Sequence, residues 1–105
     1  MKIVHLGDLG TGLDADQIRA LAGADVLMIP IGGFYTIDSD QALEIVSQLR
    51  PRIIVPMHFR RGAQGYDVIS TADAFLAKCP NPVEYPANSL TVDRETPAQT
   101  AVLYV

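Results

Sequence analysis

The chain has 105 residues, of which 49% are hydrophobic and 19% are charged, a composition typical of one globular domain and not of a disordered chain. Its formal net charge of −4 excludes a general attraction for nucleic acid or for an anionic membrane surface. The single cysteine excludes an intrachain disulfide, and neither a secretion signal nor an apolar run of the ~20 residues of a membrane span is present. We therefore expect a single cytoplasmic domain over residues 1–105.

Three short apolar runs are predicted to be strands of one sheet. They cover residues 2–6, 26–31 and 52–57. Each run is aliphatic without polar alternation, which is the pattern of strands that are buried on both faces, as in a parallel sheet.

Helical patterns follow each of these runs. Asp14 and Gln17 form a capping-box pair at the start of the first helix, and the second helix is expected over residues 39–49, with one apolar face. A third helix is expected to start near Ser70, with Asp73 at the capping-box position. The alternation of strands and helices predicts parallel strands joined by right-handed crossovers, and thus an α/β fold.

After Pro82 the pattern changes to short strand-like segments. Residues 83–85, 89–93 and 100–105 are predicted to be strands, with a turn at 96–98 between the last two. We expect these strands to extend the sheet in antiparallel fashion.

Chemically useful residues follow the ends of the three buried runs. Asp8 follows the first, a Gly-Gly-Phe-Tyr sequence at 32–35 follows the second, and His58 follows the third. Because the carboxyl ends of parallel strands share one edge of the sheet, we expect these residues to converge. A carboxylate and a neutral imidazole are both Zn²⁺ ligands, so the pair indicates a metal site. The alternatives are a turn residue for Asp8 and a hydrogen-bonded structural residue for His58.

Two further features allow alternative interpretations. The arginines around the third run are either a solvated rim or a site for an anionic substrate group; they are Arg50, Arg52, Arg60 and Arg61. The glycine-rich segment 7–12 resembles a phosphate loop, but it fits neither the G-x-G-x-x-G nor the Walker pattern, which argues against nucleotide binding.

Three segments together resemble a known family. Residues 5–10, 25–38 and 50–59 are similar, in order and spacing, to the latter half of the metallo-β-lactamase superfamily, nearest to the bacterial metal-dependent hydrolases of the ascorbate-6-phosphate lactonase type. The resemblance is close over residues 3–59 and loose over the remainder. It implies half of an αβ/βα sandwich, with a mostly parallel sheet and helices on one face.

The resemblance also implies which residues would act in such a site. Asp8 matches the aspartate that bridges two metals, and His58 matches the last histidine ligand, so both are expected to be metal-binding and catalytic residues that help to activate a water. The residues expected to line the pocket are Gly33, Tyr35, Thr36, Asp38 and Arg60. For Asp38 the alternative is an N-cap paired with Gln41. The aromatic residues that either line a pocket wall or serve packing are Phe34, Tyr35, Phe59 and Tyr66.

The chain departs from the family in its set of ligands. The family's H-x-H-x-D-H motif and a further histidine belong to the N-terminal half, whereas this chain has only His5 and His58. His5 lies inside a strand run and is expected to be packed or to support a ligand. Because Zn²⁺ normally takes at least three protein ligands, we expect Zn²⁺ or Mn²⁺ to be bound weakly or at partial occupancy.

Two functions remain open. In the first, the chain is half of a metal-dependent hydrolase acting on a small molecule, inactive unless a partner chain supplies the missing ligands. In the second, it is a non-catalytic, self-associating remnant domain. The doubly apolar strands leave one sheet face bare, so we expect a homodimer or a complementary N-terminal half to cover that face. No nucleic-acid or membrane partner is expected.

Overall fold

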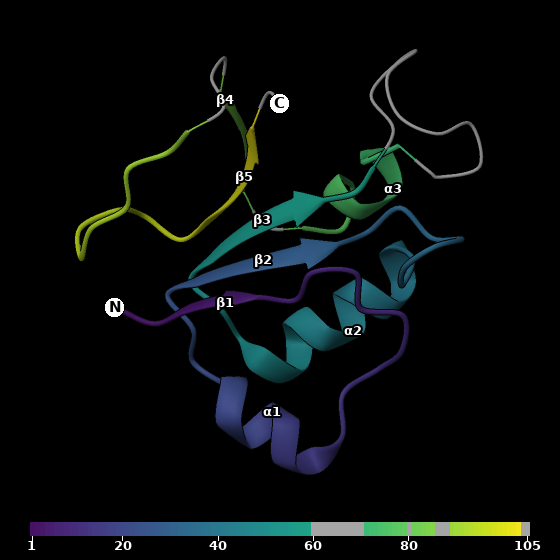
Figure 1. The fold of residues 1–105 in the computed structure, drawn as a ribbon. Helices are drawn as coiled ribbons and strands as arrows, with labels where there is room; N and C mark the ends of the chain where they lie inside the picture. Colours follow the sequence, from purple (N-terminus) through teal and green to yellow (C-terminus); the bar gives the residue numbers. More distant parts are fainter. Residues whose placement is uncertain (60–70, 80, 86–88, 104–105) are drawn as a thin grey trace.

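The computed structural model describes residues 1–59, 71–79, 81–85 and 89–103. In that part of the chain, five strands form one sheet in the order β1-β2-β3-β5-β4 (Figure 1). In chain order the elements are β1 (Ile3–His5), α1 (Ala15–Leu21), β2 (Val26–Pro30), α2 (Ser39–Leu49), β3 (Ile53–Met57), α3 (Asp73–Leu76), β4 (Pro82–Tyr85) and β5 (Gln99–Leu103). The predicted α/β class is confirmed.

The expectation of antiparallel strands at the C-terminus is wrong. β5 pairs parallel with β3, and β4 pairs parallel with β5, so that every neighbouring pair in this sheet is parallel. Two consecutive parallel strands require the chain to return to the starting edge between them. The segment expected as a strand at 89–93 belongs to that return and forms no strand.

Local capping determines where the two longer helices begin. The side chains of Asp14 and Asp38 each accept a hydrogen bond from the backbone N–H of the glutamine three residues on, and the side chain of that glutamine accepts one from the backbone N–H of the aspartate. Both predicted capping boxes are therefore confirmed. The third helix differs from its prediction. α3 is four residues long, and its N-cap, Ala72, makes no side-chain hydrogen bond. Ser70 lies outside the described residues.

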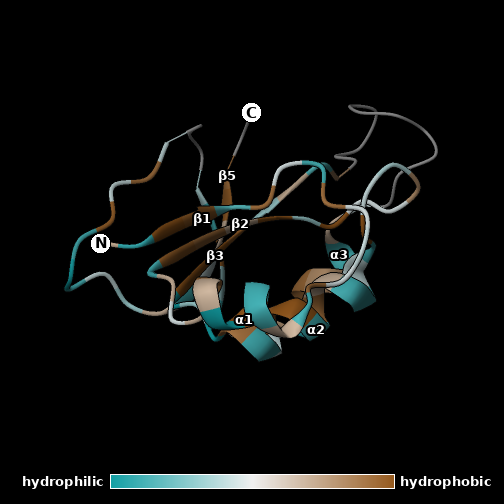
Figure 2. Ribbon diagram, turned by 60° about the horizontal axis from the view of Figure 1, so that its bottom comes forward, coloured by the Kyte–Doolittle hydropathy of each residue, from teal (hydrophilic) through white to brown (hydrophobic). Residues whose placement is uncertain are grey.

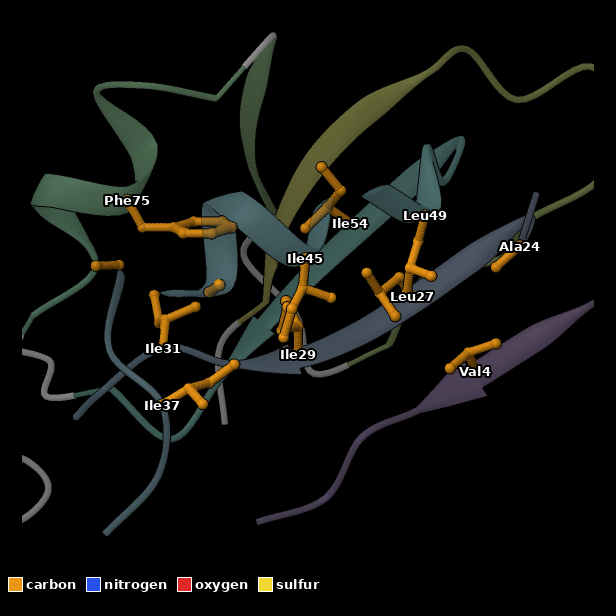
Figure 3. Packing of buried hydrophobic residues seen from close by; sticks show 12 residues of the cluster. Val4, Ala24, Leu27, Ile29, Ile31, Ile37, Ile45, Leu49, Ile54 and Phe75 are labelled. Atoms are coloured by element: carbon orange, nitrogen blue, oxygen red, sulfur yellow. The ribbon is translucent and has the colours of Figure 1, made fainter. Parts of the chain in front are cut away.

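The helices lie on one face of the sheet (Figure 2). Figure 3 shows Leu27 and Ile29 of β2 and Ile54 of β3 packed with Ile45 and Leu49 of α2, and all five side chains are at most 3% exposed. Removing this much apolar surface from water is the main contribution to stability. None of the helices in the described part of the chain is long and apolar enough to cross a membrane.

The opposite face of the sheet has a second apolar cluster. Its buried members are Val26, Ile53, Val55 and Ala101, and its partly buried members are Met28, Tyr85, Leu90, Val92 and Leu103. Leu90 and Val92 come from the segment between β4 and β5, which thus covers part of this face. At the edge strand, Ile3 remains 63% exposed. The second face is therefore apolar and only partly covered.

Candidate metal centre

Asp8 and His58 meet at the carboxyl edge of the sheet. Asp8 follows β1 and His58 directly follows β3, and β2 lies between these two strands. Nevertheless, His58 Nε2 lies 3.1 Å from Asp8 Oδ1. Their convergence, predicted from the parallel topology, is confirmed by this distance, and their role as ligands stays a prediction.

Both side chains of this pair are accessible to solvent. Asp8 is 83% exposed and His58 is 47% exposed, so a cation has open access to the carboxylate and to the imidazole nitrogen. Among the described residues, no group of three or more histidine, cysteine, aspartate or glutamate side chains is placed to hold a metal ion. One oxygen and one nitrogen donor suit Zn²⁺ in kind but fall short in number.

The backbone is unusual at the residue before Asp8 and at His58 itself. Gly7 has a φ of +56° and His58 a φ of +51°, both in the left-handed region. The Gly7 N–H donates to His5 Nδ1 at 3.0 Å, so His5 supports the turn that leads to Asp8. His5 is exposed, on the less covered face of an edge strand, so the first alternative, a packed histidine, is wrong. The second alternative, that His5 supports a ligand, stays a prediction.

The loop after β2 holds four of the five expected pocket residues. The Gly33 N–H donates to the Ile37 carbonyl at 3.1 Å, and the Thr36 hydroxyl donates to the same carbonyl at 3.1 Å. Asp38 accepts from the Gln41 N–H at 2.9 Å, so Asp38 is the N-cap of α2, as its alternative interpretation stated. No described contact places these residues around a pocket, so that expectation stays a prediction. Arg60 lies outside the described residues.

This loop is also bonded to both neighbours of the candidate ligands. The Ile37 N–H donates to the carbonyl of Leu9, next to Asp8, at 2.9 Å, and the Ile31 N–H donates to the carbonyl of Met57, next to His58, at 3.0 Å. The loop after β2 is therefore joined to the loop that follows Asp8 and to the end of β3 beside His58, and these three segments form one hydrogen-bonded frame. These bonds could not be predicted from the residue types, because backbone pairing outside strands has no residue preference.

The arginines near β3 have a structural role where the structure describes them. Arg50 is the C-cap of α2 with a φ of +49°. Arg52 donates to the carbonyls of Thr96 and Asp93 and lies 3.7 Å from Asp25. Both arginines sit at the amino edge, away from Asp8 and His58, so they do not form an anion site beside that pair. Arg60 and Arg61 are outside the described residues.

The charged groups with shifted pKa values also lie at the amino edge. The Lys2 N–H donates to Asp25 at 2.7 Å, and this bond, with the Arg52 charge, lowers the pKa of Asp25. The N–H groups of the turn that follows Asp93 lower the pKa of that carboxyl in the same way. Away from this edge, burial raises the pKa of the Cys79 thiol.

Comparisons with known proteins agree with this architecture. Residues 1–58 match the model of the beta-lactamase superfamily domain. A metal-dependent hydrolase of Thermoplasma acidophilum is 45% identical over 58 residues, which are 55% of this chain and 26% of that protein. One of Nanoarchaeum equitans is 44% identical over 57 residues, covering 54% and 26%. The chain thus spans about a quarter of the length of these relatives.

Solved structures give the same result for the fold. A Thermotoga maritima protein described as a Zn-dependent hydrolase of the metallo-beta-lactamase superfamily superposes with a TM-score of 0.81 at 30% identity, over 93% of this chain and 50% of that one. A metallo hydrolase of Ignicoccus hospitalis superposes with a TM-score of 0.53 at 34% identity, over 66% and 29%. With its parallel sheet, its one-sided helices and more than half of its residues matched by the family model, this chain belongs to the beta-lactamase superfamily.

Proposed function

We propose that this chain supplies one half of a metal-dependent hydrolase, in which Asp8 and His58 are part of a metal centre that a partner chain completes. One observation supports this most strongly: two side chains that follow strands which are not neighbours lie 3.1 Å apart, and both are exposed. The relatives of this segment are named metal-dependent hydrolases.

Each of the two residues has a definite task in this proposal. The Asp8 carboxylate supplies an anionic oxygen, and His58 supplies Nε2 in its neutral form, because a protonated imidazole cannot bind a cation. A bound Zn²⁺ or Mn²⁺ would supply the chemistry of an activated water at neutral pH. The hydrogen-bonded frame fixes the backbone that carries the two donors, which limits the ordering needed when a cation binds.

The partner is expected to cover the second sheet face. That face has a buried apolar cluster, but Ile3 at its edge is 63% exposed and Met28 is only partly buried. A complementary N-terminal half with the H-x-H-x-D-H motif would cover this face and supply the missing ligands. A second copy of this chain would also cover it, but would add only another Asp8 and another His58.

The second candidate function is a non-catalytic, self-associating domain. It is favoured by one observation: in the described residues, the pair has no third ligand. In this case a homodimer should form without any other chain, with an apolar interface of upwards of ~2,000 Å² in total. Light scattering at micromolar concentration tests it, and a stable monomer would contradict the homodimer.

Complementation is the experiment that tests the proposed hydrolase. The purified chain is mixed with the half of the Thermotoga maritima protein that it does not match, and Zn²⁺ or Mn²⁺ is added. Lactone, phosphodiester and β-lactam substrates are then assayed. We expect turnover from the mixture and none from the isolated chain, because one chain lacks the third ligand that an active centre needs.

Matched variants make this assay specific. Asp8→Ala and His58→Ala should each lower turnover by roughly a hundredfold or more, as expected for loss of a group that holds the metal. Asp16→Ala is the control, because Asp16 is as exposed as Asp8, at 87%, and lies on α1. A mixture that forms a stable complex and yet hydrolyses none of the substrates would favour the non-catalytic domain.

A further inference from the structure

Two exposed aromatic rings stand at the carboxyl edge, in the loop after β2. Phe34 is 75% exposed and Tyr35 is 61% exposed, and their rings meet edge to face with centroids 4.8 Å apart. Aromatic rings of this size are among the most favourable groups to bury. Single exposed apolar residues are ordinary on protein surfaces, so exposure alone does not assign a role to this pair.

The backbone beneath the pair supplies the second observation. The Tyr35 N–H donates to the Gly33 carbonyl at 2.8 Å, and Phe34 between them has a φ of +62°. Three residues closed by such a hydrogen bond form a γ-turn, and a γ-turn whose central residue has a positive φ is the rarer and more strained kind. A glycine would adopt this conformation freely, whereas phenylalanine is strained there by its Cβ. Packing does not explain the strain, because the Phe34 ring is mostly in solvent.

The third observation is where this turn lies. The loop that includes it is bonded through Ile37 to the carbonyl of Leu9 and through Ile31 to the carbonyl of Met57. Leu9 follows Asp8 and Met57 precedes His58. Figure 1 shows β1, β2 and β3 ending at the same edge of the sheet. The strained turn and the candidate ligands therefore belong to one frame.

We propose that Phe34 and Tyr35 form the substrate-selecting surface of this centre and bind a flat apolar group, such as an aryl ring. Residues with strained backbone cluster at active sites and ligand-binding loops. Edge-to-face and offset stacking on such rings favours planar groups over alkyl groups of similar size. The corresponding substrate is an ester or phosphodiester with an aryl group beside the hydrolysed bond. This choice of substrate rests on the proposed hydrolase function.

A matched pair of ligands tests this selection without any turnover. Phenylphosphonate and methylphosphonate carry the same anionic group and differ in the ring. Both are titrated into the Zn²⁺-supplemented chain and followed by NMR chemical shifts. We expect the aryl compound to bind roughly tenfold more tightly, with shifts at Phe34, Tyr35 and the neighbouring Leu9.

The variants separate recognition from structure. Phe34→Gly removes the ring and suits the positive φ, so the aryl preference should fall towards unity while the melting temperature stays equal to or above that of the wild type. Asp8→Ala should weaken both ligands to a similar extent and leave their ratio unchanged. A melting temperature that falls in Phe34→Gly would overturn the proposal, because it would make the ring a structural one.

The remaining outcomes distinguish this inference from the proposed function. A wild-type ratio near unity would overturn the aromatic surface even if the complemented mixture hydrolyses its substrates. A roughly tenfold preference with no hydrolysis in any mixture would support the aromatic surface and count against the hydrolase. The resonances of Phe34 and Tyr35 could instead stay unchanged with both ligands and shift only when the complementary half is added. That result would overturn the proposal and place the pair in the partner interface.

Discussion

The charged residues at the amino edge of the sheet are held in hydrogen bonds and ion pairs, whereas those at the carboxyl edge are exposed. At the amino edge, the residues just before the strands are tied together: the Lys2 N–H donates to Asp25, and Arg52 lies 3.7 Å from Asp25. Arg52 also donates to the carbonyls of Asp93 and Thr96, in the turn before β5. These groups stabilise the fold and leave few donors free to bind anything else.

At the carboxyl edge, the corresponding residues are exposed and their backbone is strained. Phe34 and His58 both have positive φ values, as Arg50 does at the amino edge, and Asp8 is 83% exposed. Strain of this kind persists only where the surrounding structure is stable enough to impose it. The comparison indicates that the amino edge stabilises the sheet, and that this stability allows the carboxyl edge to hold exposed side chains in costly conformations.

Removing the Arg52 side chain should give the largest loss of stability at either edge. Arg52→Ala leaves the carbonyls of Asp93 and Thr96 without their donor, so we expect a loss of about 2 kcal/mol in the free energy of unfolding. Urea denaturation measures it. Arg19→Ala is the control, because Arg19 is 73% exposed in a pair within α1 and should change stability by less than about 0.5 kcal/mol. If the two variants lowered the free energy of unfolding equally, the stabilising role assigned to the amino edge would be wrong.

A smaller loss is expected from Gly33→Ala at the carboxyl edge. Gly33 has a φ of +74°, and an added Cβ would lie 3.4 Å from the Cβ of Asp38. The strained conformation should cost about 1 to 2 kcal/mol, measured by thermal unfolding. Gly10→Ala is the matched control in the neighbouring loop, because its Cβ would meet no atom within 4 Å. Similar melting temperatures for both variants would show that the loop after β2 is not held tightly.

Acid should weaken the amino edge of the sheet. The pKa values of Asp25 and Asp93 are lowered in the folded state by backbone hydrogen bonds and by Arg52. Groups with lowered pKa values contribute stability above the unfolded pKa, about 4, and lose it as the pH falls through the folded pKa. Unfolding measured between neutral pH and about pH 2 should therefore be less pH-dependent in Asp25→Asn. A pH dependence identical to that of the wild type would contradict this assignment.

The smallest effect on stability is expected at the candidate ligands. Asp8 and His58 form an exposed pair, and such pairs contribute about 0 to 1 kcal/mol. Asp8→Ala and His58→Ala should therefore unfold within about 0.5 kcal/mol of the wild type, while their affinity for Zn²⁺ falls. A loss as large as that of Arg52→Ala would mean that the pair is structural.

The features that could be predicted from the sequence are those with local or topological causes. The capping boxes at Asp14 and Asp38 depend on residues three apart, and both are present. The placement of Asp8 and His58 at one edge follows from parallel strands, and the loops then bring them within 3.1 Å. The direction of β4 and β5 could not be predicted, because it depends on whether the segment between them pairs or crosses back.

The backbone strain at the carboxyl edge also could not be predicted from the sequence. Phenylalanine does not favour the left-handed region, so its residue type gives no indication of the positive φ of Phe34. Histidine is enriched in that region, but too weakly for the positive φ of His58 to be predicted. The network of Arg52 was missed for a related reason. Its acceptors are backbone carbonyls of Asp93 and Thr96, more than forty positions away, and carbonyls have no residue signature.

Calorimetric titration with Zn²⁺ tests most directly whether Asp8 and His58 are half of a metal centre. For the chain alone we predict weak or partial binding, weakened further by Asp8→Ala and by His58→Ala but unchanged by Arg52→Ala under conditions where that variant is folded. Adding the complementary half of the Thermotoga maritima protein should raise the affinity steeply, because each cation then gains its remaining ligands. Two ions held tightly by the chain alone, or wild-type affinity in either ligand variant, would contradict the account.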